Sequence, residues 1–354
     1  MRKKVRLGKI ILLVVGVLLV IFVVVSFALI NHYMKQYFNR SEQELYSEYM
    51  RWADYEDFER ETVTFPSGDE TLTGYIYGMD NLSKGLVVIS HGLGGDSEGY
   101  ISETKYFVDN GFMVFAYDNT GSGASTGDSC IGLVQSVIDL DNALTYVEQN
   151  PVFDGLPICL YGHSWGGFAT TAILNYDHDI IAVASLAGYN DSLEEMTYVG
   201  KSLLGSFAYI EKPFIWLTLR ATFGDRMKLT AANGINRAKH TAVMIIQGDL
   251  DDFVGFDGPC IYANQDKITR DDVEFVLLEG REHGNLMMDH SEKRLAYMEQ
   301  LNEEYNYMLE EYQNEIPDDV MKAWNNTIDK ELTSRLDEEL FEKIVAFYME
   351  AIGE

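Results

Sequence analysis

Basic residues are scarce in this sequence of 354 residues, which has 27 lysines and arginines against 56 aspartates and glutamates. The formal net charge at pH 7 is −29. Nucleic-acid binding depends on a basic surface that neutralises phosphates. The chain lacks such a composition, so we expect no nucleic-acid partner.

Cysteine is also rare. Cys130, Cys159 and Cys260 are isolated, without a CxxC motif or a Cys/His spacing. Three such residues provide neither a disulfide framework nor the ligand pattern of a structural zinc site. Apolar residues nevertheless make up 47% of the chain, which is enough for a full hydrophobic core and excludes a disordered chain.

Charge is absent from residues 10–30, which are apolar apart from Gly16 and Ser26. A membrane-spanning helix needs about 20 apolar residues, and a buried helix of this length would show a polar stripe. A cleaved signal peptide has a shorter apolar region and a small-x-small cleavage site, and this segment has neither. We therefore predict an uncleaved single-pass transmembrane anchor at 10–30.

The flanks of this anchor differ in charge. The segment 1–9 holds five basic residues, whereas only Lys35 and Arg40 follow the anchor closely. The positive-inside rule then predicts that 1–9 is cytoplasmic and that the remainder is extracytoplasmic. Residues 31–59 are rich in tyrosine and are predicted as a juxtamembrane helix or stalk, which docks on the following domain beyond residue 45.

Strand and helix signals alternate from residue 60 onward, which indicates an α/β fold with a mostly parallel sheet. We predict one domain over 60–290. Its expected strands are residues 61–67, 71–78, 86–90, 112–117, 158–161, 180–186, 243–247 and 273–278. The first two should form a hairpin, and the internal ones are nearly continuous apolar runs, as in strands buried on both faces.

Two segments depart from this alternation. Residues 189–240 lie between two predicted strands and are predicted as an inserted helical cap. Residues 291–354 carry six basic and 17 acidic residues, and are predicted as a C-terminal helical acidic extension. One or two helices of this extension could pack on the sheet before a solvated end.

The strongest local pattern is Gly162-His163-Ser164-Trp165-Gly166, which follows an apolar strand and precedes a helix. Gly-x-Ser-x-Gly in this context is a tight turn that holds a serine hydroxyl exposed above a sheet. Gly162 and Gly166 are expected where any side chain would clash. The alternative is a purely structural strand–turn–helix, but we interpret Ser164 as a nucleophile.

A nucleophilic serine needs a base and an acid that orients the base. His283 follows the last predicted strand and is the preferred base, whereas His290 is expected inside the next helix. Asp251 is the preferred acid because it lies midway between Gly248 and Val254, with the neighbouring Asp249 and Asp252 as alternatives. Both loops lie at the carboxyl edge of the sheet, where such folds bind ligands.

Acyl transfer also needs N–H donors for the oxyanion of the tetrahedral intermediate. One candidate is the backbone N–H of Trp165, which follows the nucleophile. The other is Leu93, in a loop that begins His91-Gly92 after the strand 86–90. We expect His91 to orient this loop rather than to take part in the chemistry.

Together these motifs resemble the α/β-hydrolase superfamily, and within it the branch of monoacylglycerol lipases, esterases and serine (proline imino-) aminopeptidases. The matching segments are 91–95, 117–125, 162–167, 248–254 and 283–284. Thr120 stands where this branch usually has arginine. The resemblance implies a sheet with helices on both faces and makes the segment 189–240 a lid over the active site.

The leading interpretation is a membrane-anchored serine hydrolase that cleaves a lipid-like or small acyl ester through Ser164, His283 and Asp251. This reaction requires no metal and no organic cofactor. A serine aminopeptidase is the alternative, and would need an acidic cap residue such as Glu194, Glu195 or Glu211 to bind the substrate ammonium. Acyl transfer to an acceptor other than water would use the same residues. A non-catalytic scaffold tethered to the membrane is the alternative outside the enzymes.

The cap segment 189–240 has seven basic and five acidic residues, although the chain as a whole is strongly acidic. One hypothesis is that the cap faces an anionic membrane or an acidic ligand. The simpler interpretation is ordinary surface charge on a packed cap. The sequence indicates no oligomeric state.

Overall fold

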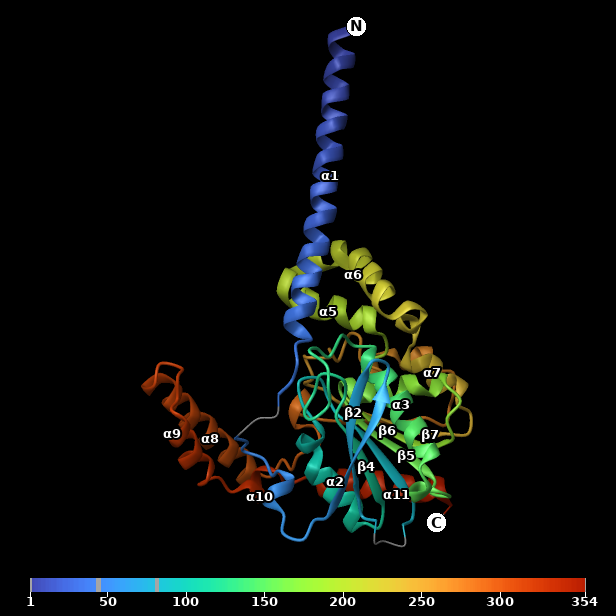
Figure 1. The fold of residues 1–354 in the computed structure, drawn as a ribbon, viewed down its shortest axis with the longest axis vertical. Helices are drawn as coiled ribbons and strands as arrows, with labels where there is room; N and C mark the ends of the chain where they lie inside the picture. The colour runs from blue at the N-terminus through green and yellow to red at the C-terminus, as the bar shows by residue number, and fades with distance from the viewer. Residues whose placement is uncertain (1, 43–45, 80–82, 354) are drawn as a thin grey trace.

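The computed structural model describes residues 2–42, 46–79 and 83–353. Within these residues, eight strands form one sheet in the order β1-β2-β4-β3-β5-β6-β7-β8 (Figure 1). The strands are β1 (Arg60–Ser67), β2 (Glu70–Tyr77), β3 (Leu86–Ser90), β4 (Met113–Tyr117), β5 (Ile158–His163), β6 (Ile180–Leu186), β7 (Ala242–Gly248) and β8 (Glu274–Leu278). β1 pairs antiparallel with β2, and β2 pairs antiparallel with β4, whereas the pairs from β4 to β8 are parallel.

The sheet forms where the sequence predicts it. Every residue of β3, β4 and β5 is buried, which agrees with their continuous apolar composition. The hairpin of β1 and β2 turns at Gly68, whose positive φ of 62° suits a residue without a Cβ. The predicted fold class, a mostly parallel sheet covered by helices, is confirmed.

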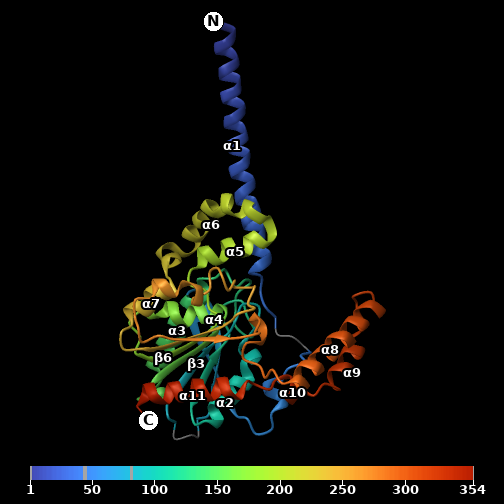
Figure 2. The same cartoon turned by 180° about the vertical axis from the view of Figure 1, so that it is seen from behind.

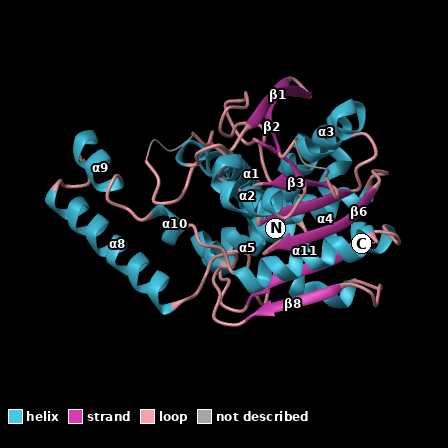
Figure 3. Ribbon diagram, turned by 90° about the horizontal axis from the view of Figure 1, so that it is seen from below, coloured by secondary structure: helices cyan, strands magenta, loops and turns pink. Residues whose placement is uncertain are grey.

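Helices cover both faces of the sheet (Figure 3), and the sheet separates two hydrophobic clusters, one on each face. One face carries α3 (Gln135–Gln149), α4 (Trp165–Ala172) and α7 (Ala231–Arg237). The other face carries α2 (Ile101–Asp109) and α11 (Glu338–Ile352). Short 3-10 helices complete the described elements: η1 (Trp52–Asp54), η2 (Ser97–Tyr100), η3 (Pro151–Phe153), η4 (Ile173–Asn175), η5 (Gly205–Phe207), η6 (Gly224–Lys228), η7 (Tyr262–Lys267) and η8 (His283–Asn285).

Two helices between β6 and β7 form a cap at one end of the sheet (Figures 1 and 2). They are α5 (Ser192–Leu204) and α6 (Ala208–Phe223). The predicted cap segment 189–240 also contains α7, but Ala231 and Ile235 of α7 are buried in the same cluster as α4. α7 therefore belongs to the helical layer on the sheet, and the cap is shorter than the predicted segment.

α1 (Arg2–Tyr37) is one continuous helix that projects beyond the cap (Figure 1). An 18-residue window within Leu7–Tyr37 has a mean hydropathy of 3.5, so this helix is long and apolar enough to cross a membrane. Each side chain from Leu7 to Ile21 is exposed, whereas Ser26 and Ile30 are buried against the cap. The predicted anchor segment is thus helical, and its end contacts the domain.

The region after α1 differs from the helical stalk predicted for 31–59. The helix ends at Tyr37, residues 43–45 lie outside the described residues, and η1 is the one helical turn described between 46 and 59. The helix ends here because the backbone groups that follow it form hydrogen bonds with the loop around residues 121–130. Phe38 O accepts a hydrogen bond from Cys130 N, and Ser41 N donates to Gly121 O, both at 2.9 Å. The segment beyond residue 45 does dock on the domain, where Met50 N donates to Ser334 Oγ at 2.7 Å.

The C-terminal region contains two parts with different surroundings. α8 (Glu292–Glu311) and α9 (Asp318–Asn325) lie side by side and project from the domain, followed by the short α10 (Lys330–Thr333) (Figures 1–3). α11 then returns to the sheet, where Phe341, Ile344 and Tyr348 are fully buried. The α/β domain therefore extends past the predicted boundary at 290, and the acidic helices that project precede the helix that packs.

Candidate active site

The turn between β5 and α4 holds Ser164 in a strained conformation, with φ 57° and ψ −113°. A positive φ is unusual for a serine and marks a position fixed by its surroundings. A Cβ at Gly166 would overlap the carbonyl oxygen of Ser90, and one at Gly162 would overlap the backbone of Gly166. The two glycines therefore allow β5, α4 and β3 to approach closely enough for this turn.

The structure brings Ser164, His283 and Asp251 together. His283 Nε2 lies 2.8 Å from Ser164 Oγ, and His283 Nδ1 lies 2.9 Å from Asp251 Oδ2. The three residues follow the carboxyl ends of β5, β8 and β7. This is the hydrogen-bond chain by which a base activates a serine hydroxyl while an acid orients the base.

Asp251 is the buried member of the three candidate acids. Burial by itself raises its pKa, but hydrogen bonds from His283, Val254 N and Gln247 outweigh that effect, so its pKa is lowered below the usual value. Asp252 is exposed, and Asp249 instead accepts a hydrogen bond from Gly280 N at 2.7 Å. Only Asp251 of the three faces the imidazole of His283.

His290 lies outside this arrangement. It precedes α8 instead of lying within a helix, and its Nδ1 is in contact with Arg281 and with Met288 O. Burial lowers the pKa of His290. The structure therefore separates the second candidate base from Ser164.

The two candidate oxyanion donors belong to the loop after β3 and to the first residue of α4. Among the described residues, the N–H groups of Leu93 and Trp165 donate to no backbone carbonyl. His91 holds the loop: its Nδ1 donates to Gly92 O at 2.7 Å, and its Nε2 accepts from Asn119 N at 2.9 Å. The imidazole thus connects the loop to the segment after β4.

Sequence reasoning missed a second network behind Ser164. Gly92 N donates to Tyr100 Oη at 3.0 Å, and Tyr100 Oη lies 2.9 Å from His163 Nδ1. His163 Nε2 in turn donates to the backbone oxygen of His283 at 3.0 Å. Burial, with a smaller contribution from His283, lowers the pKa of His163 to about 3. The neutral ring therefore links the oxyanion loop, the serine turn and the loop of His283.

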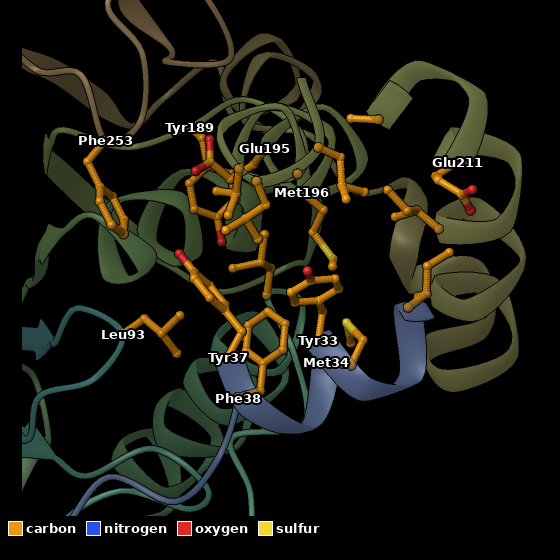
Figure 4. Close-up of a pocket in the computed structure, with 18 of the residues that line it drawn as sticks. Tyr33, Met34, Tyr37, Phe38, Leu93, Tyr189, Glu195, Met196, Glu211 and Phe253 are labelled. Atoms are coloured by element: carbon orange, nitrogen blue, oxygen red, sulfur yellow. The ribbon is translucent and has the colours of Figure 1, made fainter. Parts of the chain in front are cut away.

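Ser164 opens into an apolar pocket whose walls come from distant parts of the chain (Figure 4). The cap contributes Met196, Val199 and Ile215, and α1 contributes Tyr33, Met34 and Tyr37. Leu93, Trp165 and Phe253 surround the serine. The cavity volume is about 90 Å³, and the surface that lines it is almost entirely apolar.

Two of the three cap glutamates considered for binding a substrate ammonium, Glu195 and Glu211, line this pocket. Glu195 is buried, its Oε2 has no hydrogen-bond partner among the described residues, and burial raises its pKa well above the usual value. Glu211 accepts a hydrogen bond from Ser26 Oγ of α1 at 3.0 Å. Glu194 points elsewhere and pairs with Lys212 at 2.6 Å. Among the described residues, no group of three or more His, Cys, Asp or Glu side chains could hold a metal ion.

Comparisons with known proteins find partial sequence matches. A family model described as serine aminopeptidase, S33, matches residues 82–208. A polyketide transferase of Aspergillus fumigatus is 29% identical over 138 residues, which is 37% of this chain and 47% of that relative. Human monoglyceride lipase is 32% identical over 85 residues, 24% of this chain and 28% of the lipase. The aligned part thus spans less than half the length of these curated relatives.

The fold itself is matched more widely. Est1E from Butyrivibrio proteoclasticus superimposes with a TM-score of 0.52 and 14% identity, covering 83% of this chain and 99% of that one. The sheet order and this match show that the chain has the α/β-hydrolase fold. Within the superfamily it resembles the monoglyceride lipases, in agreement with the resemblance found from the motifs.

Proposed function

We propose that the protein is a membrane-anchored serine hydrolase that cleaves carboxylic esters with an apolar acyl group. The observation that carries this proposal is the hydrogen-bond chain from Asp251 through His283 to Ser164, at the base of an apolar pocket. The similarity to human monoglyceride lipase supports an ester as the substrate. Phe253 and Leu93 favour an apolar acyl group beside the serine.

In the proposed mechanism, Ser164 Oγ attacks the ester carbonyl carbon while His283 Nε2 takes the hydroxyl proton. The N–H groups of Leu93 and Trp165 stabilise the oxyanion. The imidazolium, held by Asp251, then gives its proton to the leaving alcohol as the C–O bond breaks. Water attacks the acyl-enzyme with His283 as its base, which releases the carboxylic acid and restores the serine.

The anchor and its orientation are part of the same proposal. The fifteen side chains from Leu7 to Ile21 are exposed and apolar or small except Lys9, and such a surface is stable inside a bilayer. The basic residues before the apolar run favour a cytoplasmic N-terminus and an extracytoplasmic catalytic domain. Epitope tags at the two ends, probed on intact and permeabilised cells, test this orientation.

A serine aminopeptidase is the second candidate, because Glu195 and Glu211 line the pocket beside Ser164. A carboxylate in this position would attract the ammonium group of a peptide substrate. The raised pKa of Glu195, however, favours its neutral form in the empty pocket, which makes it a weaker counter-ion. Turnover of aminoacyl anilides that exceeds turnover of esters would favour this candidate.

Transfer of the acyl group to an alcohol is a further candidate, favoured by the similarity to a polyketide transferase. The same acyl-enzyme would form, and an alcohol would replace water in the second half-reaction. Product analysis with added alcohol distinguishes the two reactions. A new ester as the main product would favour transfer, and free carboxylic acid would favour hydrolysis.

The testing experiment combines a fluorophosphonate probe with p-nitrophenyl esters on the full chain in detergent micelles. We expect labelling and turnover in the wild type, loss of both in Ser164→Ala, and retention of both in Ser202→Ala, an exposed serine of the cap. A folded wild type that is neither labelled nor active would contradict the proposal and favour the scaffold.

A further inference from the structure

We propose that the last turns of α1 and the residue that follows them, from Leu29 to Phe38, form a wall of the acyl-binding pocket. The predicted membrane anchor is then part of the substrate site as well as a tether. This inference rests on the proposed hydrolase function. On this inference, α1 helps to determine which acyl-chain lengths and structures the enzyme accepts.

The first observation is the set of side chains, from the end of α1 and from Phe38 directly after it, that face the pocket. They come in pairs separated by about one helical turn and thus occupy one face of the helix. These residues are Leu29, Ile30, Tyr33, Met34, Tyr37 and Phe38, and the same pocket is lined by Ser164 and Trp165 (Figure 4). The helix and the nucleophile therefore border one continuous space.

The second observation is that this end of α1 is held from above by the cap. Phe214 of α6 contacts the rings of Phe22 and Phe27 edge-on, with centroids 5.7 and 5.3 Å apart. Ser26 Oγ donates to Glu211 in a buried hydrogen bond. Ile30 is buried in a cluster with residues of α6. The wall is thus packed against the helix that covers the pocket.

The chain is also held immediately below α1. Arg40 donates to the backbone oxygens of Ser125, Gly127 and Gly123 over 2.6–2.9 Å. Ser129 Oγ donates to Phe38 O at 2.7 Å. Because both ends of the segment 29–38 are fixed, its side chains present a defined surface to a ligand.

The wall suits an alkyl chain because the pocket surface is almost entirely apolar. Met196 of the cap faces α1 in the pocket (Figure 4), so an alkyl chain between them is enclosed on both sides. Each methylene removed from water strengthens binding about fourfold. Without α1, the acyl chain would face water on that side and this gain would be lost.

The position of the wall also points to the origin of the substrate. Residues 29–38 follow the exposed part of α1 and line the pocket, so the pocket lies at the end of the domain that faces the predicted anchor. Figure 1 shows α1 projecting from this end. Leu203, Phe207 and Ile210 of the cap are exposed near the same end. The acyl chain of an ester in the outer part of the bilayer can therefore reach Ser164 along α1.

The test is the acyl-chain-length profile of the full chain in nanodiscs, measured as kcat/KM on p-nitrophenyl esters from butyrate to palmitate. Met34→Trp fills the pocket and Tyr33→Ala enlarges it. We expect Met34→Trp to lower kcat/KM for long chains at least about tenfold while butyrate changes less than about twofold. Tyr33→Ala should move the optimum to longer chains.

Gln36→Trp is the matched control, since residue 36 lies on the exposed face of α1. Its profile should equal that of the wild type. Unchanged profiles in both pocket variants, with fluorophosphonate labelling of Ser164 retained, would overturn this inference and leave the proposed function intact. Absence of labelling in the wild type would instead overturn the proposed function, and this inference with it.

A direct measurement uses an alkyl fluorophosphonate with a photoreactive diazirine on its tail. After the phosphorus has bonded to Ser164, light couples the tail to the nearest side chains. We expect crosslinks within residues 29–38 in addition to the cap. Crosslinks to the cap without any to α1 would overturn the inference, and the labelled serine would show that the nucleophile is functional.

Discussion

His163 Nε2 donates a hydrogen bond to the backbone carbonyl of His283 at 3.0 Å, so the residue before the nucleophile holds the loop of the proposed base. The opposite side of the His163 ring contacts Tyr100 Oη, which accepts a hydrogen bond from Gly92 N. One buried imidazole thus connects three loops that supply the proposed nucleophile, the proposed base and a proposed oxyanion donor. Its burial and low pKa keep it neutral, so it acts by position.

We predict that His163→Ala lowers kcat by about 10- to 100-fold with a smaller change in KM, because a misplacement of His283 impairs the chemical step. His163→Asn should recover part of the loss by restoring a donor. The measurement is ester hydrolysis alongside the rate of fluorophosphonate labelling.

The control for this prediction is His178→Ala, a histidine that pairs with Asp141 and Glu148 away from the pocket. Its kcat should match that of the wild type. An unchanged kcat in His163→Ala would show that the hydrogen bond to His283 has no positioning role.

Asp251 provides the second prediction. Asp251→Asn should lower kcat by about 10³- to 10⁴-fold, because an amide stabilises neither the required tautomer nor the imidazolium of His283. Asp252→Asn is the matched control, being the next residue in the chain and exposed. Equal activities of the two variants would remove Asp251 from the proposed mechanism. The measurement is the initial rate at saturating ester.

Much of the site could be predicted because its chemistry depends on local patterns. The turn at Ser164 needs glycines on both sides of the serine after a buried strand, and a single short segment of the sequence shows this pattern. His283 and Asp251 follow strand ends that must share one edge of a parallel sheet. The hydrogen bonds of Tyr100 and His163 could not be predicted in this way, since they join residues 63 positions apart without any motif.

Two features of the fold escaped prediction for different physical reasons. The apolar spacing of Phe341, Ile344 and Tyr348 is present in the sequence, but the acidic composition of 291–354 obscured a helix that packs on the sheet. No sequence signal marks Tyr33 and Met34 as pocket residues, because the apolar end of a helix cannot be distinguished by sequence from the rest of a membrane anchor. Whether this end of the helix lines a pocket depends on which face of α1 the cap contacts.

Glu103 provides a prediction on stability and pH. This residue of α2 is buried, neither carboxyl oxygen has a partner among the described residues, and burial raises its pKa to about 7. The unfolded chain, with a pKa near the usual 4.5, releases the proton first as pH rises. The contribution of Glu103 to stability is therefore full below pH 4.5 and is lost between about pH 4.5 and 7.

We expect this loss to be on the order of 3 kcal/mol, and Glu103→Gln to abolish it. The measurement is urea unfolding of the full chain in micelles at pH 5 and at pH 7.5. Glu299→Gln, on the exposed face of α8, should keep the wild-type pH dependence. A Glu103→Gln variant with the same pH dependence as the wild type would contradict the assignment.

The two parts of the C-terminal region should respond differently to the loss of an aromatic side chain. Phe341 of α11 is fully buried against α2 and the sheet, in contact with the rings of Tyr106 and Tyr161. We expect Phe341→Ala to lower the free energy of unfolding by about 3–5 kcal/mol. Tyr307→Ala, on the exposed side of α8, should change it by less than about 0.5 kcal/mol. Equal losses would mean that α8 is as much a part of the core as α11, whereas the predicted difference would define α11 as the last helix of the hydrolase domain and α8 as an appendage.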